Sequence, residues 1–107
     1  MAVRFEEIVF HNESGIDMSV TIEAPIGEVV VTDHPVGANS SYAVRPGKAD
    51  CRSALLEVNA PHHGVVRQSF ATAEPAAGQL SYLQNLVARH VVGSSIRGQF
   101  TASNAGS

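Results

Sequence analysis

Apolar and polar residues alternate in the early part of the chain, and this alternation has the period of a half-buried β-strand. Between positions 16 and 24 every second residue is apolar: Ile16, Met18, Val20, Ile22 and Ala24. Pro25 and Gly27 interrupt the run, and the valine triplet at residues 29–31 predicts a second strand with a fuller burial pattern. Together the two segments predict a sheet with one solvated face.

Five further segments have strand character: residues 3–10, 40–45, 51–59, 65–71 and 96–102. In the segment at residues 3–10, the apolar residues switch from one face of the strand to the other at Glu6-Glu7. A β-bulge at this pair would return them to one face. Turn signals separate the segments, and residues 33–39 are expected to form a loop because Pro35 moves the residue before it away from helical geometry.

The spacing of apolar residues changes after Pro75. Leu80, Leu83, Val87 and Val91 recur at steps of three and four, which is typical of one helix face. Pro75 suits a first helical turn and Gly93 suits the position after a helix end. This pattern predicts a helix over about residues 75–92.

The sequence therefore predicts a mainly β protein: an antiparallel β-sandwich or open barrel of about seven short strands with one helix in the C-terminal half. Residues 1–102 are expected to form a single domain, since 107 residues suit one hydrophobic core. The small polar residues at 103–107 predict a flexible tail.

Composition narrows the class of protein. Hydrophobic residues make up 44% and charged residues 16%, which favours a folded core over disorder. A net charge of −3 argues against nucleic acid and anionic membranes as partners. The sequence shows neither a signal-peptide pattern nor a membrane-length apolar run, and Cys51 is its only cysteine, so we expect a reducing cytoplasm.

Histidines supply the first candidate site. If the first six strands reverse direction in turn, the connections at residues 11–15, 33–39 and 60–64 meet at one end of the fold. The candidate metal ligands there, for a divalent ion such as zinc, are His11, His34, His62 and His63. The candidate catalytic residues are Asp33, His34, His62 and His63. The default interpretation, however, is that these are solvated loop histidines.

Two other residues could carry chemistry, but their positions favour structural roles. Cys51 begins a strand, where cysteine is usually a small core hydrophobe. A hairpin turning near His62 would place Cys51 about 30 Å from that histidine, too far for a nucleophile and its base. His90 lies on the apolar side of the predicted helix, so we interpret it as a core or boundary residue.

Candidate partner-binding residues fall into two groups. Arg45, Lys48 and Arg52 place three cations within eight residues, which could bind an anion or a carboxylate-bearing partner, although the default interpretation is an ordinary solvated turn. On the flank of the predicted helix, Tyr82 and Leu86, with Leu55, could form an exposed apolar patch for self-association or for another protein.

No catalytic or cofactor motif occurs in the sequence, and there is no tryptophan. We therefore expect a non-enzymatic binding or interaction module, forming a homo-oligomer or contacting another protein. The alternative is a small cytoplasmic enzyme, of hydrolase or isomerase type, that uses the histidine-rich end with or without a metal. An assembly subunit of a larger particle shares the evidence for the first interpretation. The sequence leaves open whether the protein is an enzyme.

Overall fold

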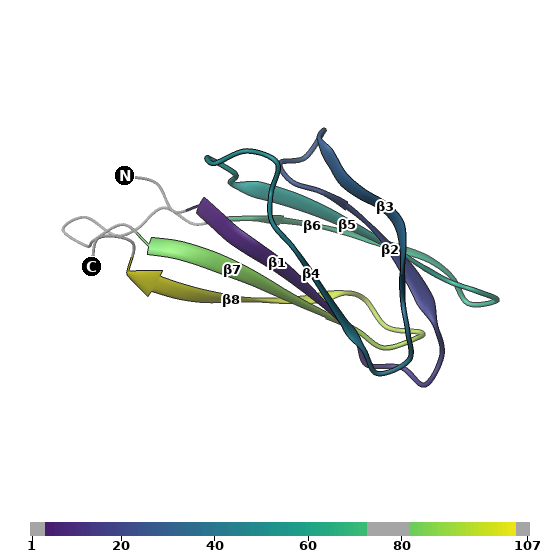
Figure 1. Cartoon of the computed structure of the whole chain (residues 1–107). Coiled ribbons are helices and arrows are strands. Elements are labelled where there is room, and N and C mark those ends of the chain that lie inside the picture. Colours follow the sequence, from purple (N-terminus) through teal and green to yellow (C-terminus); the bar gives the residue numbers. More distant parts are fainter. Residues whose placement is uncertain (1–3, 73–81, 105–107) are drawn as a thin grey trace.

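The computed structural model describes residues 4–72 and 82–104, and over these residues the chain forms eight strands. They are β1 (Arg4–Asn12), β2 (Met18–Glu23), β3 (Val29–Val36), β4 (Ser41–Val44), β5 (Ser53–Ala60), β6 (Gly64–Ala71), β7 (Tyr82–His90) and β8 (Arg97–Asn104). Two four-stranded sheets have the orders β4-β1-β7-β8 and β3-β2-β5-β6 and pack against each other (Figure 1). Neighbouring strands are antiparallel except for β1 and β7. The predicted mainly β, two-sheet fold is confirmed.

The core lies between the sheets and follows the alternation of the sequence. The inward residues of β2 and β5 are buried: Met18, Val20, Ile22, Ala54, Leu56 and Val58. The expected bulge in β1 is present, because the register with β7 shifts between Phe5 and Glu7. Phe5, Ile8 and Phe10 consequently all face the core. The alternation of apolar and polar residues in the sequence thus identifies the residues that face inward.

The helix predicted over residues 75–92 is wrong for residues 82–90, which form strand β7, while residues 75–81 lie outside the described part of the chain. Leu86, Ala88 and His90 are buried at alternate positions. β7 lies in the middle of its sheet between β1 and β8. The spacing of its apolar residues resembled that of a helix because Val87, on the face opposite Leu86 and Ala88, is apolar too.

Strand β3 also differs from expectation. It continues to Val36, so the first residues of the predicted loop at 33–39 belong to the strand, and Pro35 pairs with Ser19 of β2. Pro35 is tolerated because β3 is at a sheet edge. The edge position also explains why the valine triplet is less buried than expected, with Val29 57% exposed. A register shift opposite Thr21 places Asp33 at a φ of 46°.

The two sheets approach each other closely where β6 meets β8. The ring of Phe70 lies against Gly98, and a side chain at this position would overlap the ring. Glycine thus allows an aromatic residue of the edge strand β6 to cover the opposite sheet. Phe70 also packs against the main core cluster, as expected from its inward position in the sequence pattern.

Strand directions define two ends of the sandwich. Because successive strands alternate in direction, the connections at residues 13–17, 37–40, 61–63 and 91–96 lie at one end, which we call the loop end (Figure 1). The connections at residues 24–28 and 45–52 lie at the opposite end. β8 continues to Asn104, two residues into the predicted tail. No helix in the described residues is long and apolar enough to span a membrane.

Candidate functional site

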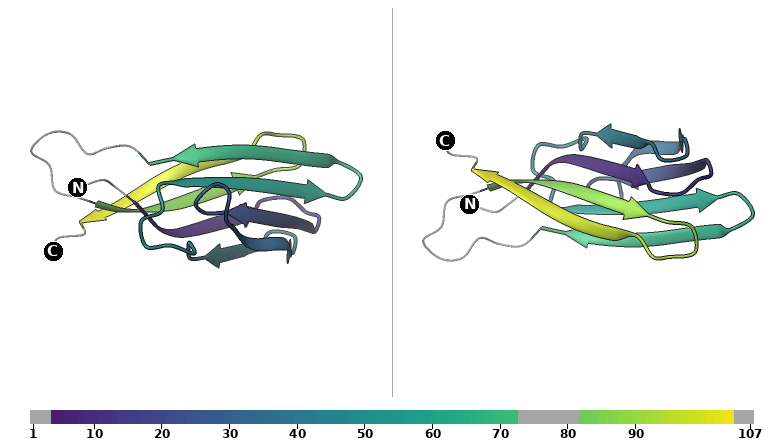
Figure 2. Two further views of the ribbon diagram at one scale, coloured as in Figure 1. Left: turned by 90° about the horizontal axis from the view of Figure 1, so that it is seen from above. Right: turned by 90° about the horizontal axis from the view of Figure 1, so that it is seen from below.

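Four connections of the chain come together at the loop end. The hairpin between β5 and β6 projects farthest, and both views of Figure 2 show it extending beyond the other loops. The remaining three connections, β1–β2, β3–β4 and β7–β8, are tied to one another by hydrogen bonds through buried side chains. They therefore form a fixed base from which exposed side chains project.

Asn12, the last residue of β1, is the centre of this base and is 1% exposed. Its amide nitrogen donates to the carbonyl oxygens of Ile16 at 2.8 Å, Val36 at 3.1 Å and Gly37 at 3.0 Å. Its amide oxygen accepts from the backbone nitrogen of Ser14 at 2.9 Å. One buried side chain thus joins the β1–β2 loop to the start of the β3–β4 loop.

Ser14 extends the network to the β7–β8 loop. Its hydroxyl oxygen accepts from the backbone nitrogen of Val92 at 2.7 Å, and its carbonyl accepts from that of Asn39 at 3.0 Å. The backbone nitrogen of Glu13 donates to the carbonyl of His90 at 2.9 Å. Loops held in this way lose little further freedom when a ligand binds, which favours binding.

Three depressions surround Glu13, which lines all of them. The serine depression, about 230 Å³, is lined by His11, Asn12, Glu13, Asn39, Ser40 and Ser41. The arginine depression, about 330 Å³, is lined by Glu13, Arg89, Val91, Ser94, Ser95 and Arg97. The apolar depression, about 320 Å³, contains Ile16, Val91, Val92 and His63 beside Glu13. Glu13 is held among them by a 2.8 Å ion pair with Arg89.

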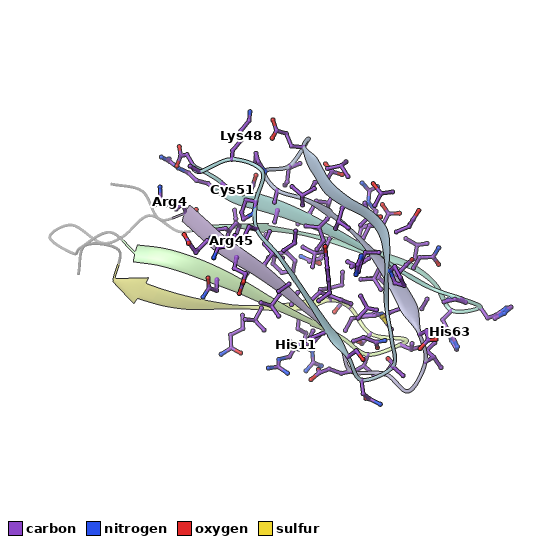
Figure 3. All side chains as sticks on the ribbon, in the orientation of Figure 1. Arg4, His11, Arg45, Lys48, Cys51 and His63 are labelled. Carbon is purple, nitrogen blue, oxygen red and sulfur yellow. The ribbon has the colours of Figure 1, made fainter. Side chains whose placement is uncertain are left out.

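The histidines expected to share this end are not gathered into one site. His34 lies on β3 with its ring stacked on Tyr42 at 3.8 Å between centroids, and Asp33 beside it is hydrogen-bonded to Thr21. His62 and His63 are exposed at the tip of the β5–β6 hairpin, and Figure 3 shows His63 well separated from His11. Among the described residues, no three histidine, cysteine or carboxylate side chains are close enough to hold a metal ion.

His11 makes a contact that the sequence did not suggest. Its Nδ1 forms a hydrogen bond with the hydroxyl of Ser41, its partner across the β1–β4 pair. The backbone nitrogen of Asn12 donates to the carbonyl of Ser40, so His11 and Ser41 are a non-hydrogen-bonded pair, in which cross-strand side chains are closest. The result is a histidine–serine pair at the wall of the serine depression.

The cations expected to bind an anion lie at the opposite end, and each has a carboxylate neighbour. The pairs are Lys48 with Glu28 at 2.7 Å, Arg52 with Asp50 at 3.2 Å and Arg45 with Glu6 at 3.9 Å. The hydrogen bond and charge of Glu28 raise the pKa of Lys48. Figure 3 shows Arg45 and Lys48 far from His63. Their positive charge is compensated locally, which weakens the interpretation as an anion site.

The predicted surface position of Leu86 is wrong. Leu86 is fully buried because it lies on the inward face of β7 rather than on a helix flank. The side chain of Tyr82 is outside the described part of the structure. Leu55, the third member of the predicted patch, is half-buried on β5 in the other sheet. The apolar patch cannot form as expected, and self-association stays a prediction.

Cys51 and His90 are both buried, as the sequence suggested, although Cys51 precedes strand β5 and His90 ends strand β7 rather than lying on a helix. Cys51 is fully buried, its Sγ donates to the carbonyl of Ser53, and burial raises the pKa of the thiol, so it is a core residue. His90 is 2% exposed, and its Nδ1 has no hydrogen-bond partner. Burial lowers the pKa of His90, and a hydrogen bond to the backbone of Ser95 opposes this effect only in part.

Sequence reasoning missed the contribution of Arg89, Arg97 and the β7–β8 loop, because β7 was interpreted as part of a helix. The alternation of Leu86, Ala88 and His90 was the signal that could have revealed the strand. With β7 and β8 as a hairpin, residues 91–96 join the other connections at the loop end.

The fold and these contacts define a two-sheet β-sandwich with one hydrogen-bonded loop end that carries three depressions. No protein-family model matches the chain, and no curated protein has a significantly similar sequence. Its function has to be argued from the loop end itself.

Proposed function

We propose that the protein is a binding module whose ligand-contacting surface is the loop end. The observation that carries this proposal is the convergence of three depressions on Glu13, above a base that Asn12 and Ser14 hold in place. Small-molecule sites usually combine a preformed hollow, apolar walls and a few polar groups of fixed position. The arginine and apolar depressions together offer each of these elements.

The surface features of the loop end support this choice over the rest of the molecule. Val91 is 47% exposed and lines both the arginine and the apolar depression. A large aliphatic side chain held in water beside two arginine and two serine residues suits a ligand with both an apolar and a polar part. At the opposite end, the cations are neutralised by their own carboxylates.

Nuclear magnetic resonance with the full-length ¹⁵N-labelled protein tests the proposal. We expect a library of small organic fragments to yield ligands that shift the amide resonances of residues 13–16 and 91–95, and we expect these ligands to be recovered unchanged. Val91→Glu should abolish the shifts because a charge would enter the apolar wall. The matched control is Val29→Glu, at a valine that is 57% exposed at the opposite end. Shifts concentrated at residues 45–49, or none at the loop end, would contradict the proposal.

A second candidate function is hydrolysis, and one specific contact favours it. The hydrogen bond between His11 and Ser41 is the arrangement by which a base activates a serine nucleophile. Against this, the backbone nitrogens of Asn12, Asn39 and Ser40 are already engaged by carbonyl oxygens, so they cannot stabilise an oxyanion. A fluorophosphonate reagent decides the matter: an adduct on Ser41 that His11→Gln prevents would support hydrolysis, whereas an unlabelled Ser41 would exclude this role.

A further inference from the structure

Two arginines face each other across the hairpin at the loop end. Arg89 of β7 and Arg97 of β8 are directly paired in the register and line the same depression. Side chains directly opposite in an antiparallel pair have Cβ atoms roughly 4.5–5.5 Å apart, and like charges at such positions destabilise the sheet. Negative charge nearby relieves this repulsion.

The protein supplies only part of that charge. The carboxylate of Glu13 pairs with Arg89 at 2.8 Å, with both side chains partly exposed. Arg97 has no ion pair among the residues that the structure describes. The three side chains therefore leave one uncompensated positive charge at the depression, on the residue that lies across from Arg89.

The surroundings of this charge indicate the rest of the ligand. Ser94 and Ser95 line the arginine depression beside Arg97. The hydroxyl of Ser94 already donates to the carbonyl of Val91 at 2.6 Å, so it is Ser95 that offers a hydroxyl donor there. Val91 and Glu13 separate this depression from the apolar one, in which Val92 and Ile16 form the wall. A molecule that crosses Val91 would meet a cation at one end and aliphatic side chains at the other.

We propose that the loop end binds a small aliphatic monocarboxylate, with its carboxylate on Arg97 and its hydrocarbon part across Val91 in the apolar depression. The planar guanidinium of arginine can hold a carboxylate by two parallel hydrogen bonds. A single negative charge matches the single uncompensated arginine, whereas a phosphate dianion would carry excess charge and be repelled more strongly by Glu13 than a monocarboxylate. This inference rests on the proposed binding function and specifies the class of its ligand.

Titration of the full-length protein with hexanoate, followed by amide shifts, tests the inference. We expect hexanoate to shift residues 13–16 and 91–97 and to bind more tightly than acetate, hexanamide or hexyl phosphate. Acetate lacks the apolar part, hexanamide lacks the charge, and hexyl phosphate carries the wrong charge. Equal binding of hexanamide, or tighter binding of hexyl phosphate, would overturn the inference.

The decisive variant is Arg97→Gln, which should weaken hexanoate binding about tenfold to a hundredfold because one charged hydrogen-bonding partner is lost. The variant should fold, since it removes a like-charge contact. The matched control is Arg4→Gln, which makes the same change at an exposed arginine far from the loop end (Figure 3). Its effect on affinity should be less than about twofold.

The outcomes separate this inference from the proposed function. If hexanoate binds equally to Arg97→Gln and to the unmodified protein, the carboxylate assignment is wrong. The binding function still stands in that case when uncharged fragments shift the loop end. If no fragment of any charge shifts residues 13–16 or 91–97, both the inference and the proposed function fail.

Discussion

The two ends of the sandwich are held together by different kinds of interaction. At the loop end, hydrogen bonds pass through Asn12 and Ser14, whose side chains are 1% and 6% exposed. At the opposite end, the ties run through exposed groups, such as the ion pair of Lys48 with Glu28 and the bond from the backbone of Ile26 to Ser53. Buried polar networks strongly specify one geometry, whereas solvated ion pairs contribute little. The comparison is the physical reason for which we propose a preformed site at the loop end and not at the opposite end.

Replacement of Asn12 should have the largest effect. Asn12→Ala leaves three carbonyl oxygens and one backbone nitrogen without their partner. We expect the free energy of unfolding to fall by at least about 3 kcal/mol, as measured by urea denaturation. Asn59→Ala, at an exposed asparagine of β5, serves as the control and should change it by less than about 0.5 kcal/mol. Equal effects of the two replacements would show that the network does not hold the loops.

A serine at each end gives a direct comparison of buried and exposed hydrogen bonds. Ser14→Ala removes the acceptor for the backbone nitrogen of Val92 and should cost about 1–2 kcal/mol. Ser53→Ala removes the acceptor for the backbone nitrogen of Ile26. Because this hydrogen bond is exposed, a water molecule can take the place of the serine hydroxyl, and the free energy of unfolding should fall by about 0.5 kcal/mol or less. Denaturation of both variants under the same conditions measures the difference. A larger loss for Ser53→Ala would reverse our assignment of the more rigid end.

Acid should destabilise the loop end through His90. Burial lowers the pKa of this histidine below its ordinary value of 6.5, so the unfolded chain takes up a proton before the folded protein does. The contribution of His90 to the free energy of unfolding is therefore fully present above pH 6.5. It is lost as the pH falls from 6.5 through the lower pKa of the folded protein. In His90→Gln, melting temperature should depend less on pH between about 7 and 5. An unchanged slope would mean that another group causes the acid sensitivity.

The smallest effect is expected at Lys48. The Glu28 hydrogen bond raises the pKa of this lysine above 10.5, so its contribution is present below pH 10.5 and is lost as the pH rises through the folded pKa. Both side chains are well exposed, at 64% and 42%, and salt screens such pairs. Lys48→Gln should leave the unfolding transition unchanged at neutral pH and about 0.15 M salt. A clear loss of stability would show that the opposite end is held more tightly than its exposure indicates.

Alternation was a reliable guide where strands have one wet face. Met18, Val20 and Ile22 on β2, and Ala54, Leu56 and Val58 on β5, were all placed inward from the sequence and are buried. The bulge at Glu6-Glu7 was predicted from a change of parity and is present. Such strands are predictable because burial on one face leaves a period of two in the sequence.

Strands β7 and β3 were harder to predict. β7 has an apolar residue, Val87, on its outward face as well as Leu86 and Ala88 on its inward face, and its spacing then resembled a helix. β3 contains Pro35, which led us to predict a loop at residues 33–39. Pro35 is compatible with a strand only because β3 lies at the edge of its sheet. Whether a strand is central or at an edge depends on pairing between distant segments, which local patterns do not contain.

What the sequence by itself determined was the class of fold and the grouping of connections at two ends, since both follow from strand periodicity and strand reversal. The tertiary structure decided which residues at the loop end act together. Asn12 lies within the connection that the sequence placed at residues 11–15, and its role depends on carbonyls at Ile16, Val36 and Gly37 that strand pairing brings around it. Arg89 and Arg97 became neighbours only through the register of β7 with β8. Contacts of this kind arise from packing between segments, and so only the folded chain contains them.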